Sequence, residues 1–263
     1  TKPVGGGLAD YGCQYLKPKT KNLSNLIQDL KNKNLIIKSN IIQNGEAFIA
    51  PYGMNKIPQY LSLGVNTLLN QKVYYIKKNS NHWEVSTNSF LLKSKILVLT
   101  MPINQVSELL KVSDAPIADL PTANYKSFYT ITFQAMDNFY SKTVRKNDFA
   151  PWICNNSLKG LSTGQNTFTV NINEELSNTL LNMEDNKKHE LIKRHLKESG
   201  FKNFSFYNLH YWRYAFTEGQ NNITNYYNED NMLAICGDSF STGQADGAVV
   251  SAQKTFEKIR SIF

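Results

Sequence analysis

The clearest pattern of apolar and polar positions lies at residues 233–259. The run Leu233–Cys236 is short and continuously apolar, which is typical of a strand covered on both faces in a parallel sheet. A flexible stretch, residues 239–244, comes next. Apolar residues then recur at helical spacing, at Ala248, Val249, Ala252, Phe256 and Ile259. The segment therefore predicts a strand, a turn and a helix.

Three residues of this segment suggest a ligand site. Gly237-Asp238 follows the strand, and Gly247 stands where we expect the helix to open. Such a turn places free backbone N–H groups and the positive end of a helix beside a carboxylate, which suits a ligand with hydroxyl groups and negative or developing negative charge. An ordinary turn, with glycine for tight packing, is the alternative that this segment leaves open.

The first hundred residues alternate between short strands and helices. Residues 9–16 predict a strand, and residues 23–33 predict a helix. Residues 35–51 predict two strands around an Asn-Gly pair, which is a strong hairpin signal. A short helix is expected to begin near Asn55.

Three strand signals follow, at residues 71–78, 82–87 and 95–101. They predict an antiparallel meander whose last strand is buried. Pro102 ends that strand, and the next eight residues have helical spacing.

Longer aromatic strands dominate residues 120–220, with the helical stretch "NKKHELIKRHLKES" among them. This region predicts an antiparallel sheet. The chain then returns to the buried strand and helix of residues 233–259, which indicates an inserted second domain. We expect an α/β fold, α+β overall, with a Rossmann-like layer and an inserted antiparallel-sheet domain.

Composition narrows the class of protein. The formal net charge is +8, but the lysines are scattered among many asparagines, so we interpret the excess as compositional bias and expect no nucleic-acid partner. The sequence contains neither a long apolar run nor a basic-then-apolar leader, so we expect no membrane association. Three well-separated cysteines fit neither a disulfide framework nor a zinc site and favour the cytoplasm.

Several catalytic motifs are not supported. His189 and His195 are six residues apart, so they lie on opposite helix faces and predict a solvated helix rather than a metal site. The sequence has no nucleophile elbow, which argues against a hydrolytic triad. The stretch "GGGLADYG" has no preceding strand and no following helix in the pattern, so it predicts a glycine-rich turn and no phosphate cradle.

Two tryptophans have polar neighbours. Trp152 lies near Asn155, Asn156 and Lys159, and Trp212 precedes Arg213. Both patterns are also typical of core aromatics with polar tips, and that alternative stays open.

The segments taken in order resemble the renalase-like flavoproteins of the FAD-dependent amine-oxidase superfamily. The resemblance rests on "LADYGCQYL", "YGMNKIPQYL", "VYYIKKNSNHWEVS", "LVLTMPINQVSELL", "PWICNNSLKG", "HYWRYAF" and "CGDSFSTGQADGAVVSAQ". These segments cover nearly the whole chain. The last three together are the most specific.

The resemblance implies a set of site residues. Asp238, with Gly237, would bind the ribityl or pyrophosphate region of FAD. The other cofactor residues would be Gly247, Ala248 and Val249 at the pyrimidine edge, Val73 at the adenine, Thr100 and Pro102 under the cofactor, and Gly12, Cys13 and Gln14 along the isoalloxazine. Trp152, Trp212 and Tyr214 would line the catalytic, substrate side.

The resemblance also implies domains and a reaction. The FAD-binding domain would comprise residues 1–16, 66–115 and 225–263, and the substrate domain residues 17–65 and 116–224. The expected activity is oxidation of a small amine or a reduced nicotinamide-type ring, with O2 as acceptor. The family's glycine-rich dinucleotide turn is absent from these 263 residues, so we expect the chain as written to hold FAD poorly. A non-catalytic scaffold that keeps the aromatic pocket is the alternative.

Overall fold

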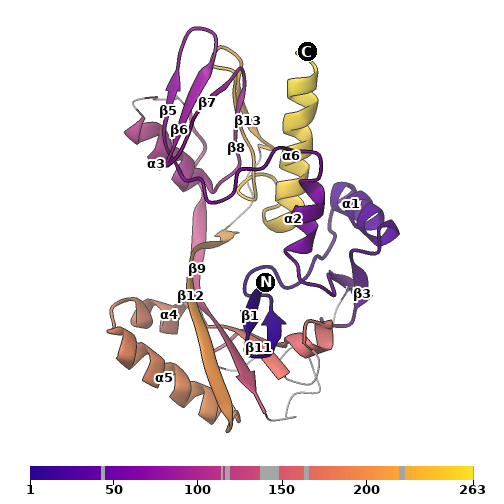
Figure 1. Ribbon diagram of the computed structural model, residues 1–263, viewed down its shortest axis with the longest axis vertical. Helices are drawn as coiled ribbons and strands as arrows, with labels where there is room; N and C mark the ends of the chain where they lie inside the picture. Colours follow the sequence, from indigo (N-terminus) through magenta and orange to yellow (C-terminus); the bar gives the residue numbers. More distant parts are fainter. Residues whose placement is uncertain are drawn as a thin grey trace. The chain divides into compact units, whose positions relative to one another are not determined.

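The computed structural model describes residues 1–42, 45–113, 115, 119–136, 148–162, 166–218 and 223–262 (Figure 1). The chain divides into two compact units. Unit 1 comprises Thr1–Pro18, Ser24–Leu63 and Lys126–Ala215, and unit 2 comprises Lys19–Leu23, Gly64–Tyr125 and Phe216–Phe263. Residues 1–16, which we expect to contact the cofactor, thus fall in the unit that holds residues 126–215. Compactness does not test which residues hold a ligand, so the predicted domain division stays a prediction.

The main sheet of unit 1 has four strands in the order β10-β11-β9-β12. The strands are β9 (Asn124–Ala135), β10 (Trp152–Asn155), β11 (Asn166–Asn171) and β12 (Phe204–Glu218). β10 pairs with β11, and β11 with β9, both antiparallel. The antiparallel sheet predicted for residues 120–220 is therefore confirmed.

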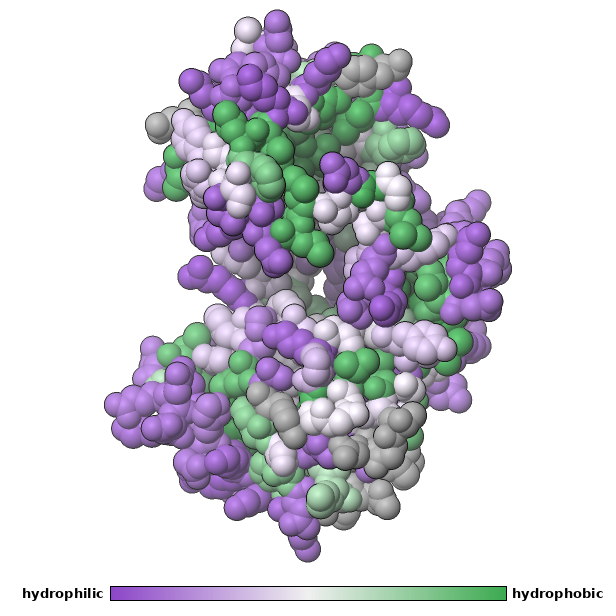
Figure 2. All heavy atoms as spheres, viewed as in Figure 1, coloured by the Kyte–Doolittle hydropathy of each residue, from purple (hydrophilic) through white to green (hydrophobic). Residues whose placement is uncertain are grey.

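Helices α4 (Glu174–Leu181) and α5 (Asp185–Glu198) lie along one side of this sheet (Figure 1). Leu180, Ile192 and Leu196 bury their side chains against the sheet aromatics Phe133 and Phe168. The side of α5 turned to solvent is strongly hydrophilic in Figure 2, as the prediction of a solvated helix requires. Helix α4 was not predicted. Its start is fixed by Asn173, whose side chain accepts a 2.7 Å hydrogen bond from Leu176 N.

A short hairpin, β1 (Lys2–Val4) and β2 (Gly7–Ala9), opens unit 1. Its turn contains Gly5 in the left-handed region, with φ 57°. A strand, not a helix, follows the glycines, so the prediction of a glycine-rich turn is confirmed. The strand predicted at 9–16 is wrong for residues 10–15, while Leu16 forms an isolated antiparallel bridge with Phe48. One side-chain amide bonds the backbone there instead of a strand partner: Gln14 Nε2 donates to the carbonyls of Asp10 and Gly12.

The remaining elements of unit 1 follow the predicted order. Helix α1 spans Lys21–Asn32 and begins in unit 2. Strands β3 (Ile37–Ser39) and β4 (Ala47–Ile49) pair antiparallel. Helix α2 (Lys56–Leu61) has Asn55 as its N-cap residue, and a 3₁₀ turn, η1, spans Asn156–Lys159. The predicted helices and strand pair are confirmed, while Asn44 of the Asn-Gly pair lies outside the described residues.

Unit 2 contains two small sheets. In one, β5 (Val73–Lys78), β6 (Trp83–Thr87) and β7 (Leu91–Ser94) form an antiparallel meander. In the other, β8 (Leu97–Leu99) runs parallel to β14 (Leu233–Ile235), which also pairs antiparallel with β13 (Tyr226–Asn228). Helices α3 (Ile103–Val112) and α6 (Gln244–Arg260) also belong to this unit.

The predicted meander needs one correction. Its third strand is β7, whereas the strand predicted at 95–101 belongs to the other sheet as β8. The chain bends at residues 95 and 96 between the two strands, where the Ser94 hydroxyl bonds the Ile96 carbonyl. The predicted parallel strand at 233–236 is confirmed, because every residue of β14 is fully buried and pairs in parallel with β8.

Candidate functional site

The turn after β14 lies at the carboxyl end of the parallel strand pair. Cys236 N donates to Leu99 O at 3.1 Å, so β8 and β14 end side by side. A Cβ built on Gly237 would lie 3.5 Å from Thr100 O, which shows how near the two strand ends are. The structure thus brings together three predicted residues, Thr100, Gly237 and Asp238. The carboxyl ends of parallel strands are where α/β sheets bind ligands.

The Asp238 carboxylate is half-buried and hydrogen-bonded. Tyr125 Oη donates to Asp238 Oδ1 at 3.3 Å. Burial raises the pKa of Asp238 above its usual value, while the hydrogen bond from Tyr125 acts in the opposite direction. Burial, and secondly the nearby Asp238 charge, raise the pKa of Tyr125 to about 12, so Tyr125 remains a donor at neutral pH. Sequence analysis missed Tyr125, because 113 positions separate it from Asp238.

Helix α6 begins earlier than the sequence pattern predicts. Gly243 is the N-cap residue and Gln244 the first helical residue. Gly247 N donates to Gly243 O at 2.7 Å, so this N–H is part of the helix and does not face a ligand freely. The N–H groups that lack an intrahelical acceptor are those of residues 244–246. The expectation that Gly247, Ala248 and Val249 offer the helix-start N–H groups is therefore wrong. These groups belong to residues 244–246, about one turn earlier.

Two residues near this helix start have structural roles. A Cβ on Gly247 would lie 2.5 Å from Phe240 O, so glycine is required for close packing of the turn. Asp246 is buried and accepts hydrogen bonds from Lys19 N at 3.0 Å and from Thr20 N and Oγ1 at 2.9 and 2.6 Å. Asp246 thereby holds the residues that precede α1.

The other predicted residues of unit 2 lie on several elements. Val73 is the half-buried first residue of β5. Pro102 is the N-cap residue of α3, and its carbonyl accepts from Gln105 N and Val106 N at 2.8 and 3.1 Å. Ala248 and Val249 are half-buried one turn into α6. Within the described part of the chain, no contact places Val73, Pro102, Ala248 or Val249 beside Asp238.

The predicted residues Gly12, Cys13 and Gln14 follow the hairpin of unit 1. Gln14 is 7% exposed. Its Nε2 donates to the Asp10 carbonyl and, at 3.0 Å, to the Gly12 carbonyl. These two acceptors fix the orientation of the amide. Its Oε1 is buried and has no partner among the described residues. The exposed Cys13 thiol bonds the Tyr15 carbonyl at 3.3 Å.

A buried ion pair supports this loop. Lys159 Nζ lies 2.5 Å from Asp10 Oδ2, and both side chains are at most 1% exposed. Met54 N donates to the other oxygen, Oδ1, at 3.0 Å. Asn156 Oδ1 accepts from Asp10 N at 3.2 Å. Two of the three polar residues near Trp152 in the sequence, Asn156 and Lys159, thus hold the loop that begins at Asp10.

The three predicted substrate-side aromatics all lie in unit 1. Trp212 stacks on Tyr11, with ring centroids 5.3 Å apart, and a Cβ on Gly12 would lie 3.3 Å from its ring. Trp152 packs against Tyr15 at 5.4 Å, and its buried Nε1 has no partner among the described residues. Tyr214 has the Arg213 guanidinium 6.0 Å from its ring centroid. The structure therefore joins Trp212 to Gly12, whereas no contact between described residues joins Trp152 to Trp212.

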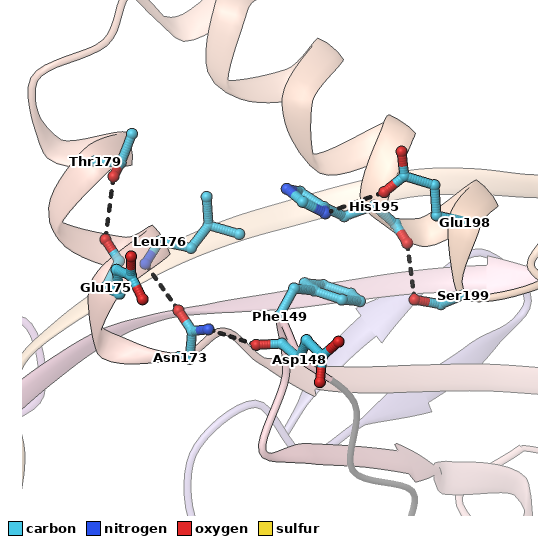
Figure 3. A pocket seen from close by; sticks show the side chains of 9 residues that line it. All are labelled: Asp148, Phe149, Asn173, Glu175, Leu176, Thr179, His195, Glu198 and Ser199. Atoms are coloured by element: carbon cyan, nitrogen blue, oxygen red, sulfur yellow. Dashed lines mark hydrogen bonds and ion pairs between the residues drawn. The ribbon is translucent and has the colours of Figure 1, made fainter.

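A pocket of about 550 Å³ lies elsewhere in unit 1 and contains none of the predicted residues (Figure 3). Phe149 forms part of its wall and stacks on His195 at 5.2 Å. The polar groups in Figure 3 mostly bond one another: Asn173 Nδ2 donates to Asp148 O, and His195 Nδ1 lies 3.3 Å from Glu198. The pocket is a groove beside α4 and α5 whose polar groups are largely satisfied locally.

Two kinds of feature are absent from the described residues. No group of three or more His, Cys, Asp or Glu side chains is placed to hold a metal ion. No helix in the described ranges combines the length and apolar character needed to cross a membrane.

Comparison with known proteins shows which fold this is. No protein-family model and no curated protein matches the chain. Among solved structures, an Exiguobacterium sp. 255-15 protein described as a protoporphyrinogen oxidase matches 83% of this chain and 53% of its own, with TM-score 0.61 and 14% identity. An oxidoreductase from Methanosarcina mazei matches 90% and 59%, with TM-score 0.57 and 11% identity. Cyclohexylamine oxidase from Brevibacterium oxydans IH-35A matches 80% and 52%, with TM-score 0.53 and 12% identity.

These matches define the class of fold. The chain has a mixed helix and sheet fold that it shares with oxidoreductases, including amine oxidases. It spans a little over half the length of each of these structures. At 11–14% identity the likeness concerns the fold.

Proposed function

We propose that this chain forms part of a flavin-dependent oxidoreductase that binds FAD and oxidises a small hydride donor, with O2 as acceptor. The donor is an amine or a reduced nicotinamide-type ring. The fold shared with oxidases supports the class of enzyme. The observation that carries the cofactor is the half-buried Asp238 carboxylate at the end of the parallel pair β8 and β14.

Each unit, taken by itself, offers groups that suit part of a flavin nucleotide. The Asp238 carboxylate can accept hydrogen bonds from the hydroxyls of a ribityl or ribose chain. The first turn of α6, residues 244–246, supplies N–H groups and a positive helix end for negative charge. In unit 1, the orphaned Oε1 of Gln14 is an acceptor fixed in place for a ligand N–H. Leaving such an atom unsatisfied is costly, so we expect a ligand N–H or a bound water molecule to donate to it.

When bound, the flavin supplies the acceptor for a hydride. The residues of the chain position and shield the reactants. Trp152, Trp212 and Tyr214 would hold a flat substrate, with Gly12 and Cys13 along the flavin ring. Val73, Thr100, Pro102, Gly237, Gly247, Ala248 and Val249 would line the cofactor, the last three by packing rather than through helix-start N–H groups.

Replacing Asp238 by Asn tests the cofactor assignment. The variant keeps the size and one acceptor but loses the charge. We expect FAD affinity to fall by about 1.5 to 3 kcal/mol, roughly ten- to a hundredfold, because a charge-assisted hydrogen bond is lost. Flavin fluorescence titration of the purified protein measures the dissociation constant.

Asp230→Asn is the matched control, since Asp230 is exposed in the same unit before β14. It should leave FAD affinity unchanged. If the parent and Asp238→Asn bound FAD equally tightly, Asp238 would not belong to the cofactor site. Because the glycine-rich turn is absent from these residues, we expect the parent to bind FAD weakly. A protein that binds aromatic ligands but shows no flavin binding even at high FAD concentration would instead be a binding scaffold, and the proposed enzyme function would be wrong.

A further inference from the structure

Four side chains of unit 1 form a compact group, the Lys2 cluster: Lys2, Tyr11, His210 and Trp212. The Tyr11 and Trp212 rings stack at 5.3 Å with 25° between their planes. The His210 ring meets Trp212 at 4.3 Å and Tyr11 at 5.3 Å, both edge-on. Lys2 Nζ lies 4.3 Å from the Tyr11 ring centroid. All four residues are partly exposed, so the cluster is open to a ligand.

The backbone holds the Lys2 cluster in place. Trp212 Nε1 donates to Tyr11 O at 3.1 Å. Gly12 lets the indole approach, because a Cβ at this position would lie only 3.3 Å from the ring. Rings fixed in this way lose little conformational entropy when a ligand stacks on them.

The charges around the Lys2 cluster are unbalanced. Asp10 is the acidic residue next to Tyr11, and its charge is taken up by the buried Lys159 at 2.5 Å. Burial, and secondly the Lys2 charge, lower the pKa of His210, so the imidazole is mostly neutral at neutral pH. Lys2 therefore sets the sign of the potential at the cluster.

We propose that the Lys2 cluster binds a planar ring that carries an anionic group, with Lys2 as the residue that selects the charge. The ring stacks on the exposed part of Trp212, and the anionic group pairs with the ammonium of Lys2. A protonated amine at the same place is repelled by Lys2. The inference rests on the proposed function only where it assigns the Lys2 cluster to the substrate side. If the cluster binds the substrate, Lys2 favours a substrate with an anionic ring over an amine.

Three probes with the same ring and different charge test this inference. Benzoate is an anion, benzamide is neutral and benzylamine is a cation at pH 7. Ligand-observed NMR gives a dissociation constant for each with the purified protein. We expect benzoate to bind most tightly and benzylamine most weakly, with the difference reduced by salt.

Two variants separate charge from stacking. Lys2→Met should weaken benzoate about two- to fivefold and leave benzamide unchanged, as expected for a partly exposed ion pair. Trp212→Phe should weaken all three probes. Lys187→Met, a change at an exposed lysine of α5, is the control and should have no effect. Benzylamine binding at least as tightly as benzoate, or an unchanged benzoate affinity in Lys2→Met, would overturn the inference.

This experiment is independent of the flavin. The order of the three affinities can be measured whether or not the protein binds FAD. A protein without FAD affinity that prefers benzoate contradicts the proposed function alone. A protein that binds FAD but prefers benzylamine contradicts the charge selection alone.

Discussion

Lys159 and Asp10 are the residues whose environment differs most from what their types prefer. Both are charged, yet neither is more than 1% exposed. Removing one partner of a buried ion pair leaves an uncompensated charge in the interior. We therefore expect Lys159→Met to lower the free energy of unfolding by about 3 to 5 kcal/mol, as measured by urea denaturation.

Two further variants test the cause of this loss. Adding Asp10→Asn to Lys159→Met removes the orphaned charge and should restore part of the stability, so the two effects should not add. Lys187→Met on the surface of α5 should stay within about 0.5 kcal/mol of the parent. A loss below about 1 kcal/mol for Lys159→Met would contradict a buried ionised pair.

Sequence patterns predicted the residues of the site only where they stand in one local segment. Asp238 follows an apolar strand, and that context placed it correctly at a strand end. The partners that matter most are far away in sequence: Lys159 is 149 positions from Asp10, and Tyr125 is 113 positions from Asp238. Periodicity within a segment contains no information about such pairs.

At the scale of elements, the turn between β14 and α6 shows why the helix start was misplaced. The apolar stripe begins at Ala248, but the helix already begins at Gln244 after Gly243. Residues 244–246 add no apolar face, and Asp246 is buried for hydrogen bonding instead. Strand β7 was missed because Leu91 and Leu92 are adjacent and both exposed, so the strand lacks the alternation of apolar and polar residues that marks a half-buried strand. Helices and strands with a buried apolar face, such as α1, α3 and β14, were predicted correctly.

Gly247 gives an element-scale prediction. Alanine usually stabilises a helix interior relative to glycine by about 0.5 to 1 kcal/mol. Here a Cβ would lie 2.5 Å from Phe240 O, a backbone atom that cannot move without opening the turn. We expect Gly247→Ala to reverse the usual sign and destabilise the protein by about 1 to 3 kcal/mol in urea denaturation.

The exposed position Lys254 of the same helix is the control. Lys254→Ala should change stability by no more than about 0.5 kcal/mol. If Gly247→Ala were as stable as the parent or more so, the close packing of α6 on the turn would be wrong. Glycine at this position would then need a different explanation.

At the scale of the whole molecule, we expect the ionised Asp238 carboxylate to lower the free energy of unfolding while it raises the affinity for the cofactor. Burial raises the pKa of Asp238 in the folded protein above its unfolded value. As the pH rises above about 4, the Asp238 side chain therefore ionises in the unfolded chain before it ionises in the folded protein. Because the folded state then binds more protons, the free energy of unfolding falls as the pH rises through the folded pKa. Such a cost in stability is expected of a residue retained for function.

Asp238→Asn removes the ionisation and should remove this dependence. We expect the variant and the parent to be closest in stability near pH 3, where both side chains are neutral. The variant should become the more stable of the two towards pH 7, in the absence of any ligand. Urea denaturation of both proteins at several pH values measures the difference, and Asp230→Asn at an exposed site should show none. A variant that is less stable than the parent at pH 7, by a margin that grows with pH, would identify Asp238 as a stabilising cap of its turn rather than a carboxylate held for a cofactor.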